Sequence, residues 1–441
     1  MKLTMMGTGY VGLTSGVCFS DFGHEVVCYD PNPEIIAELN SGNIPIYEPG
    51  LDAVMVRNIE TGRLKFTDNL SEAMTDVDAV FITVGTPTLK GDGHADLKYV
   101  RDAAKEIAAK LSGYTTIITK STVPVGTNRE VEKLISQVNP DADFDVVSNP
   151  EFLREGSAVH DFMVPDRIVI GAKTEKAKAV MTDIYKPLFL RDFPIVFTNF
   201  ESAELIKYAS NAFLATKITF INEIAGLCEK VGAEVEDVSR GMGLDNRIGD
   251  KFLHAGPGYG GSCFPKDTRA LARTGQDYSE PMEITETVIR VNEDRKRKMI
   301  EKITDVCGGT VNGKTVAVLG VTFKENTDDL REAPSLTIVP SLVGSGAKVR
   351  VSDPLAESKG SRILPGVEWC VDAYQAAADA DALIILTGWN QFKALDLTRL
   401  ALAMKTPRMV DLRNLYSAER VIPAGFEIYS GIGSKTVNKL A

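Results

Sequence analysis

Short apolar runs alternate with amphipathic segments over the first 150 residues of the chain. The runs have the length and composition of strands, and several of the segments between them carry apolar residues at helical spacing. This alternation predicts an α/β domain in which a parallel sheet is covered by helices on both faces. The expected strands are residues 3–6, 25–29, 79–84, 116–119 and 145–147.

The pattern changes near residue 202. From 202 to 230, apolar residues recur at helical spacing without a proline, which predicts one unusually long helix. A segment rich in glycine and proline follows at 254–265, and a second helical pattern then ends in the charged run 292–298. We therefore expect a mainly helical middle domain that one ordered loop interrupts.

Strand and helix patterns return after about residue 310, with strands expected at 315–319, 348–352, 382–386 and 409–411. The chain is thus predicted to hold three domains: an N-terminal Rossmann domain at 1–200, a central helical domain with a long helix at 201–300, and a C-terminal Rossmann-like α/β domain at 301–441. No G-x-G-x-x-G motif follows the strand at 315–319, which argues against a second dinucleotide site.

Composition narrows the class of protein. The 441 residues carry a formal net charge of −11, which argues against a nucleic-acid-binding protein. Six cysteines without a CxxC pair and four histidines without metal-ligand spacing argue against a disulfide framework and a metal site. With no apolar run long enough to span a membrane, the sequence predicts a cytoplasmic protein.

The first predicted strand leads into Gly7, Gly9 and Gly12, spaced as G-x-G-x-x-G, and a helical pattern follows. These glycines permit a tight turn, a close approach of the main chain to a pyrophosphate, and close packing of the helix on the sheet. The next strand ends at Asp30, whose carboxylate accepts ribose hydroxyls and repels a 2′-phosphate. The pattern predicts NAD rather than NADP; a glycine-rich turn beside an exposed aspartate is the alternative. The expected NAD contacts here are Gly7, Gly9, Tyr10, Val11, Gly12 and Asp30.

The loop at 256–267 reads Gly-Pro-Gly-Tyr-Gly-Gly-Ser-Cys-Phe-Pro-Lys-Asp. Its glycines allow the main chain to wrap closely around a ligand, and the thiol among them, Cys263, is a candidate nucleophile. Lys266 would favour the thiolate, which is the reactive form. The alternative is a small buried cysteine in a turn, and we adopt that interpretation for Cys18, Cys28, Cys228, Cys307 and Cys370.

Four segments resemble the UDP-glucose/GDP-mannose dehydrogenase family: 260–267, 120–126, 149–156 and 204–213. Within that family the cysteine loop is most similar to the UDP-glucose 6-dehydrogenase signature, and the similarity extends from Gly7 to about Tyr416. The resemblance implies NAD as cofactor, UDP-glucose as substrate, UDP bound by the C-terminal domain, and two oxidations of the sugar C6 that give UDP-glucuronate. It also implies a homodimer or higher homo-oligomer built on the long helix.

A two-step oxidation explains the need for a cysteine. The first hydride transfer leaves an aldehyde, which has no alcohol hydrogen left to lose. Addition of the Cys263 thiolate gives a thiohemiacetal, which donates a second hydride and becomes a thioester that water cleaves. A dehydrogenase that stops at the aldehyde needs no thiol.

The resemblance assigns further roles near the sugar C6. Lys207 and Asn211, four apart on a helix, would stabilise oxyanions. Asp267 and Thr122 would hold the catalytic water, and Glu151 would take part in acid–base chemistry. A surface lysine, an exposed asparagine, a turn aspartate, a strand-end threonine and a solvated helix face are the alternatives. The implied catalytic residues are Thr122, Glu151, Lys207, Asn211, Cys263 and Asp267.

Other implied contacts are spread along the chain. Arg331 would reach NAD, Lys324 and Arg413 would contact the nucleotide, and Arg247 would act across a subunit interface; an ordinary surface cation is the alternative for each. The further NAD contacts are Thr122, Glu155, Lys266 and Arg331. The substrate contacts are Glu151, Phe152, Leu153, Arg154, Glu155, Lys207, Asn211, Arg247, Phe252, Leu253, His254, Ala255, Gly256, Gly260, Lys324 and Arg413.

Three other functions stay open. One is a relative that acts on another sugar, a GDP-mannose or UDP-N-acetylmannosamine dehydrogenase. A second is a one-step hydroxyacid dehydrogenase, in which Lys207 suffices and one NADH forms per substrate instead of two. The third is a catalytically silent nucleotide-binding protein, against which the joint presence of Thr122, Lys207, Cys263 and Asp267 argues.

Overall fold

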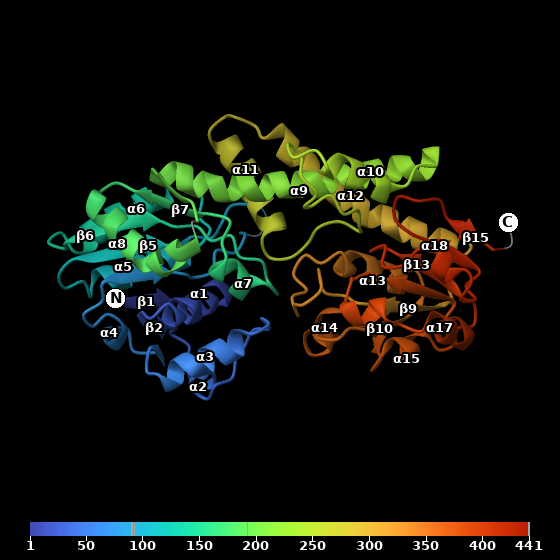
Figure 1. Cartoon of the computed structure of the whole chain (residues 1–441), viewed down its shortest axis with the longest axis horizontal. Helices are drawn as coiled ribbons and strands as arrows, with labels where there is room; N and C mark the ends of the chain where they lie inside the picture. Colours follow the sequence, from blue (N-terminus) through green and yellow to red (C-terminus); the bar gives the residue numbers. More distant parts are fainter. Residues whose placement is uncertain (90, 92, 192, 440–441) are drawn as a thin grey trace. The chain divides into compact units, whose positions relative to one another are not determined.

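A computed structural model describes residues 1–89, 91, 93–191 and 193–439. The chain divides into two compact units: Met1–Ser210 with Arg273–Glu280, and Asn211–Ala272 with Pro281–Ala441. Two helices in Figure 1 carry residues of both units, α9 (Phe200–Val231) and α11 (Phe264–Asp277). The division between the units therefore falls inside helices.

In the described part of the first unit, eight strands form one sheet in the order β3-β2-β1-β4-β5-β6-β7-β8. Neighbouring strands are parallel except β6 and β7. The strand order reverses between β1 and β4, and such sheets bind ligands beyond the carboxyl ends of the strands at that point. The strands are β1 (Lys2–Met6), β2 (Glu25–Tyr29), β3 (Leu64–Thr67), β4 (Ala79–Ile82), β5 (Thr115–Thr119), β6 (Phe144–Ser148), β7 (Ile168–Ala172) and β8 (Ile195–Thr198).

Helices cover both faces of this sheet. Along β4, Ala79 and Phe81 join a buried cluster with residues of α1, whereas Val80 and Ile82 join another with residues of α5 and α6. A strand buried on both faces must be apolar throughout, which explains the continuous apolar run. The helices of this unit are α1 (Tyr10–Asp21), α2 (Pro33–Asn40), α3 (Leu51–Glu60), α4 (Leu70–Ala73), α5 (Lys98–Ala108), α6 (Thr127–Val138), α7 (Ala158–Met163), α8 (Glu175–Tyr185) and the 3-10 helix η1 (Lys186–Arg191).

The predicted long helix is α9, which has 32 residues; α10 (Val235–Gly243) and α12 (Glu283–Val306) also lie in the middle of the chain. The predicted end of the second helical pattern at 292–298 is wrong. Helix α12 continues to Val306 because Met299, Ile303 and Val306 extend its buried stripe beyond the charged run. Within the described ranges, no helix has the length and apolarity required to cross a membrane.

The described part of the second unit contains a seven-stranded sheet in the order β11-β10-β9-β12-β13-β14-β15, antiparallel only at β14 and β15. Six of these strands repeat the order of the first six strands of the other sheet. The elements are β9 (Thr315–Leu319), α13 (Ser335–Gly344), β10 (Lys348–Ser352), α14 (Glu357–Ile363), β11 (Val367–Trp369), α15 (Ala373–Ala377), β12 (Ala382–Ile385), α16 (Asn390–Lys393), α17 (Leu397–Ala403), β13 (Arg408–Asp411), α18 (Ala418–Val421), β14 (Ile428–Ser430) and β15 (Val437–Asn438).

All nine predicted strands are present, and the two α/β folds are confirmed. Strands β3, β7, β8, β11, β14 and β15 were not predicted. Strand β15 has two residues and β11 has three, and both residues at the centre of the edge strand β8 are exposed, so apolar periodicity does not mark them. The predicted parallel sheet is confirmed for the five strands expected in the first unit, and the one antiparallel pair in its described part joins β6 to β7, which was not predicted.

Candidate functional site

The loop after β1 forms a cradle that fits a dinucleotide. Gly7 has a φ of +105°, and a Cβ on Gly12 would lie 1.9 Å from the Gly7 carbonyl oxygen and 2.6 Å from Oγ1 of Thr83. Only glycine at position 12 therefore allows α1 to pack this closely. A Cβ on Gly9 would meet no protein atom within 4 Å, so its main chain is open to a ligand. The three glycines occupy the positions that the fingerprint requires.

Asp30 follows β2 and is anchored to the same loop. Its Oδ2 accepts hydrogen bonds from the N–H and the hydroxyl of Thr8 at 3.0 and 2.9 Å, and its Oδ1 accepts from the N–H of Asn32 at 3.1 Å. A carboxylate offers about four acceptor positions, so one remains for a ribose hydroxyl. A negative charge fixed here disfavours a 2′-phosphate, which agrees with NAD.

Tyr10 opens α1 and binds Glu48, a buried residue that sequence reasoning missed. Glu48 also accepts hydrogen bonds from the N–H groups of Gly156 and Ala158, both at 2.7 Å. Burial and the Glu48 carboxylate raise the pKa of Tyr10 far above its usual value. Glu48 thus ties the start of α1 to the loop that follows β6. Only this contact across more than 100 residues reveals its role.

A buried ion pair joins this loop to α9. Nζ of Lys207 lies 3.0 Å from Oε1 of Glu151, and the side chains are 3% and 6% exposed. Burial alone raises the pKa of the Glu151 carboxyl, but the Lys207 ammonium and the N–H of Leu153, 2.6 Å from Oε2, bring it below its usual value. The alternatives of a surface lysine and a solvated helix face are therefore excluded. Residues 151–155 form a loop, not a helix.

Lys120 is a second buried lysine in the same unit, and its role was not predicted. Its Nζ lies 3.3 Å from Oδ1 of Asn149 and 3.2 Å from the hydroxyl of Tyr185. Burial lowers the pKa of Lys120 to about 8, while Glu151 raises it and Lys207 lowers it further. Lys120, Glu151 and Lys207 therefore form one electrostatic cluster of two cations and one anion.

The other predicted residues of this unit lie in loops after β5 and β6. The carbonyl of Thr122 accepts a hydrogen bond from Oγ1 of Thr86 at 2.8 Å, and Glu155 is 9% exposed. The ring of Phe152 lies 5.4 Å from Nζ of Lys207. Arg154 is turned to the surface, where it binds Asp161 at 2.6 Å.

In the second unit, Cys263 stands immediately before α11. Its carbonyl accepts the first helical hydrogen bond, from the N–H of Asp267 at 2.8 Å. The positive end of a helix favours a thiolate at this position. The other five cysteines are buried and Cys263 is half-buried, which supports their assignment as structural residues.

Asp267 lies one turn into α11 and is fully buried. Its Oδ2 accepts a hydrogen bond from the amide of Asn211 at 2.6 Å, and its Oδ1 lies 2.5 Å from Nζ of Lys266. Asn211 is itself 7% exposed, so the structure contradicts the alternative of an exposed helix residue. Lys266 stands beside a carboxylate, an arrangement that orients Asp267 and neutralises its charge.

The main chain just before Cys263 approaches the segment after β9 so closely that only glycine fits there. A Cβ on Gly260 would lie 2.4 Å from the carbonyl oxygen of Glu332, and one on Gly261 would lie 2.8 Å from the ring of Phe323. The N–H of Gly261 donates to the carbonyl of Arg331 at 2.9 Å. The cysteine loop and the 323–332 segment therefore support each other.

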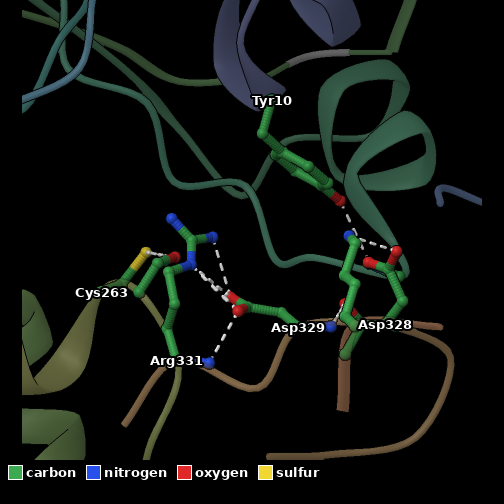
Figure 2. A network of polar contacts seen from close by, with 9 residues as sticks. Tyr10, Cys263, Asp328, Asp329 and Arg331 are labelled. Carbon is green, nitrogen blue, oxygen red and sulfur yellow. Dashed lines mark hydrogen bonds and ion pairs between the residues drawn. The ribbon is translucent and has the colours of Figure 1, made fainter. Parts of the chain in front are cut away.

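The predicted cations of this unit differ in their environments. Arg331 forms paired bonds with Asp329 (Figure 2), with 2.8 Å between Nη2 and Oδ2. Arg413 donates to the carbonyls of Leu386 and Phe323 at 2.9 and 3.0 Å, and burial lowers its pKa. Lys324 lies 5.7 Å from the ring of Phe323, whereas Arg247 is 89% exposed and binds Asp245.

The stretch 252–256 leads toward this loop. Phe252 has a φ of +67°, which is uncommon for a residue with a side chain and indicates local strain. Leu253 and Gly256 are buried, Ala255 is half-buried and His254 is exposed. A strained, partly exposed main chain beside buried glycine is suited to contact a ligand.

Asp353 ends β10, as Asp30 ends β2. Its Oδ2 accepts from the N–H groups of Val321 and Thr322 at 2.7 and 3.3 Å, and its Oδ1 accepts from Leu355 and Ala356 at 3.0 Å. With a fifth bond, from Nε1 of Trp389 at 3.3 Å, these hydrogen bonds fill its acceptor positions. The second sheet therefore repeats the topology of the first, but the carboxylate at the matching place has no acceptor position left for a ribose hydroxyl, which agrees with the prediction of a different ligand.

Three models of known protein families match the chain and together cover most of it. The NAD binding domain of the UDP-glucose/GDP-mannose dehydrogenase family matches residues 1–189, the central domain of that family matches 201–294, and its UDP binding domain matches 317–418.

Individual relatives match over nearly their whole length. A UDP-glucose 6-dehydrogenase of Rhizobium meliloti is 57% identical over 98% of this chain and 99% of its own, and one of Bacillus subtilis is 48% identical over 99% and 94%. The solved UDP-glucose dehydrogenase of Pyrobaculum islandicum is 40% identical, with a TM-score of 0.90 and 98% of both chains covered. The UDP-D-ManNAc dehydrogenase of Pyrococcus horikoshii is 28% identical, with a TM-score of 0.86 over 98% of this chain and 99% of its own.

Proposed function

The chain belongs to the UDP-glucose/GDP-mannose dehydrogenase family, and from this premise we propose that it oxidises UDP-glucose to UDP-glucuronate in two NAD-dependent steps. Two relatives named UDP-glucose 6-dehydrogenase, 57% and 48% identical over almost the whole chain, support the substrate. The single structural observation that carries the reaction is the half-buried Cys263 at the start of α11, one helical turn before the fully buried Asp267.

When bound, NAD⁺ would supply the hydride acceptor for each oxidation. The chain's part is to hold it: Gly7, Gly9 and Gly12 receive the pyrophosphate, and Asp30 receives the ribose. Tyr10, Val11, Thr122 and Glu155 are further proposed contacts from the first unit, and Lys266 and Arg331 are those from the second.

In the first oxidation the C6 hydroxyl loses a proton and the carbon loses a hydride, giving an aldehyde. In the second, the Cys263 thiolate adds to the aldehyde carbon, a C–S bond forms, and loss of a hydride gives a thioester. Water then attacks the thioester, the C–S bond breaks, and the thiol and the acid are released. Lys207 and Asn211 stabilise the oxyanions, Asp267 and Thr122 hold the water, and Glu151 exchanges protons.

The proposed substrate contacts fall into two groups. Residues 151–155 and the side chains of Lys207 and Asn211 hold the sugar. Residues 252–256, together with Gly260, Lys324 and Arg413, hold the nucleotide diphosphate, and Arg247 acts across a subunit interface. The UDP binding model that matches 317–418 supports this division. The three domains that we propose are 1–200, 201–300 and 301–441.

We further propose a homodimer or a higher homo-oligomer that assembles through α9. Large apolar side chains repeat on the surface of this helix, about two turns apart from Leu205 to Leu227 and one turn further at Val231: Leu205, Phe213, Phe220, Leu227 and Val231 are 43–66% exposed. Light scattering should give at least twice the mass of one chain, and Phe213→Glu should lower it. None of the six cysteines, all of which are among the described residues, forms a disulfide, and this favours a cytoplasmic location.

The deciding experiment combines a substrate panel with a cysteine variant. The protein is incubated with NAD⁺ and UDP-glucose, GDP-mannose or UDP-N-acetylmannosamine, and both NADH and the acid are measured. We expect UDP-glucose to react best, with two NADH per sugar, and Cys263→Ser to lose acid formation. One NADH per sugar, or full acid formation by Cys263→Ser, would contradict the proposal.

A further inference from the structure

Buried side chains hold the main chain of the loop before Cys263 at two residues. At Gly256, Oδ1 of Asn222 accepts a hydrogen bond from the N–H at 2.8 Å, and Nε of Arg295 donates to the carbonyl at 3.0 Å. At Tyr259, Oδ1 of Asn292 accepts from the N–H at 2.8 Å, and its Nδ2 donates to the carbonyl at 3.1 Å. Both residues thus have their main-chain donor and acceptor satisfied by side chains.

These three side chains, which we call the loop clamp, lie on helices α9 (Asn222) and α12 (Asn292 and Arg295). Asn222 is 4%, Asn292 3% and Arg295 7% exposed. Polar groups are costly to bury. Asn222 and Asn292 direct these bonds at the loop, whereas Arg295 donates to the Gly256 carbonyl through Nε and, at 3.4 Å, to the Asn222 carbonyl through Nη1. The loop must also have glycine at position 258, because a Cβ there would lie 2.9 Å from Oδ1 of Asn292.

The clamp is connected to Cys263 through a short, fixed stretch of main chain. Beyond Tyr259, the N–H of Gly261 is held by the carbonyl of Arg331 at 2.9 Å, and the carbonyl of Cys263 is held by the N–H of Asp267 at 2.8 Å. Fixed points therefore stand at 256, 259, 261 and 263. A displacement of Tyr259 reaches the thiol after four residues, with little freedom to absorb it.

We propose that Asn222, Asn292 and Arg295 are positioning residues that hold the 256–259 loop so that the Cys263 thiol meets the aldehyde carbon. They touch neither reacting atom themselves. This inference rests on the proposed function, since it concerns the thiol step. It assigns the clamp to the second oxidation, because the first oxidation needs no sulfur.

The chain offers a matched pair of variants at one position. Asn222→Asp keeps the oxygen that accepts the Gly256 N–H, whereas Asn222→Leu removes it at similar size. At the other end, Asn292→Leu removes both bonds to Tyr259, and Asn292→Asp keeps only the acceptor. Arg290→Ala is the control on the same helix, because Arg290 is 67% exposed.

Two measurements are made on each variant of the full chain: oxidation of the isolated aldehyde form of the sugar nucleotide with NAD⁺, and alkylation of Cys263 by iodoacetamide without ligands. We expect both Leu variants to lose about ten- to hundredfold in aldehyde oxidation, the effect of leaving buried hydrogen-bonding groups unsatisfied. Their alkylation rates should also change severalfold. Asn222→Asp and Arg290→Ala should match the parent, Asn292→Asp should be intermediate, and NAD affinity should be unchanged throughout.

The outcomes separate the clamp from the reaction. If the Leu variants keep the parent's alkylation and aldehyde oxidation rates, or if Asn222→Asp is as impaired as Asn222→Leu, the clamp is refuted. If Asn292→Leu does not fold, the Asn222 pair still decides. Full acid formation by Cys263→Ser refutes the thioester instead, and the alkylation rates then still report whether the clamp positions the thiol.

Discussion

From the cluster of Lys120, Glu151 and Lys207 we predict that the same substitution, Lys207→Met, has opposite effects on stability in two backgrounds. In the parent, one buried carboxylate faces two buried lysines. Glu151→Gln removes the carboxylate that faces both lysines and leaves two cations facing each other. Lys207→Met leaves one cation and one anion, and the carboxylate keeps the N–H of Leu153 at 2.6 Å. Lys207→Met should therefore destabilise the parent but stabilise the Glu151→Gln variant, where it removes one of two cations that repel each other.

The size of the effect follows from the burial of the pair. Removing one partner of a buried ion pair costs about 3–5 kcal/mol. For a unit of this size each kcal/mol shifts Tm by roughly 2–4 °C, so Glu151→Gln should lower Tm by about 6–20 °C. Lys207→Met should cost less, because Lys120 remains to balance Glu151. Arg101 and Glu130 provide the control: their atoms lie 2.6 Å apart, but the side chains are 48% and 45% exposed. Glu130→Gln should therefore cost under about 1 kcal/mol.

The assay is thermal unfolding of the parent, the two single variants, the double variant and Glu130→Gln at pH 7 without ligands. The transition assigned to the first unit is identified by its shift when NAD is added. If Lys207→Met has the same sign in both backgrounds, or if Glu130→Gln is as harmful as Glu151→Gln, the charge balance we describe is wrong. In parallel, Lys207→Met should lose turnover and keep its affinity for NAD.

Two further predictions concern the first unit. Gly9→Ala places its methyl in open space, so Tm should be unchanged while NAD affinity falls at least about tenfold. Gly12→Ala forces the Gly7 carbonyl to move and should lower both Tm and NAD affinity. Titration with NAD and thermal unfolding test this, and unchanged NAD binding by either variant would contradict it. The pKa of Lys120 is lowered from 10.5 to about 8, so between these values the unfolded chain binds more protons than the folded chain, and stability rises with pH. Relative to Lys120→Met, the free energy of unfolding of the parent should rise by about 1 kcal/mol per pH unit from pH 8 to 10 and should not change below pH 7, as measured by urea unfolding. If the free energies of unfolding of the two proteins change in parallel with pH, the prediction is refuted.

Sequence reasoning succeeded where the chemistry is local. The glycine fingerprint, the 32-residue helix and the cysteine loop are each contained in one continuous segment, so spacing and residue type suffice to find them. Residues defined by distant partners were missed. Glu48 is bound to Gly156 and Asn292 to Tyr259, and nothing in their neighbouring residues distinguishes them from a surface acid and a helical amide. The charged run at 292–298 misled for the same reason, because its burial depends on what packs against it.

Three of the buried charged residues belong to the proposed chemistry. Glu151 and Lys207 in the first unit and Asp267 in the second are each less than 7% exposed, and a hydrophobic replacement of such groups often stabilises a protein. Their retention therefore indicates a use other than stability. Cys263 stands at the start of α11, where main-chain dipoles favour a thiolate. That Lys266 also favours the thiolate stays a prediction, and the Lys266 ammonium lies 2.5 Å from the Asp267 carboxylate. Lys266→Met should then disturb Asp267, and with it thioester hydrolysis, more than the alkylation rate of Cys263.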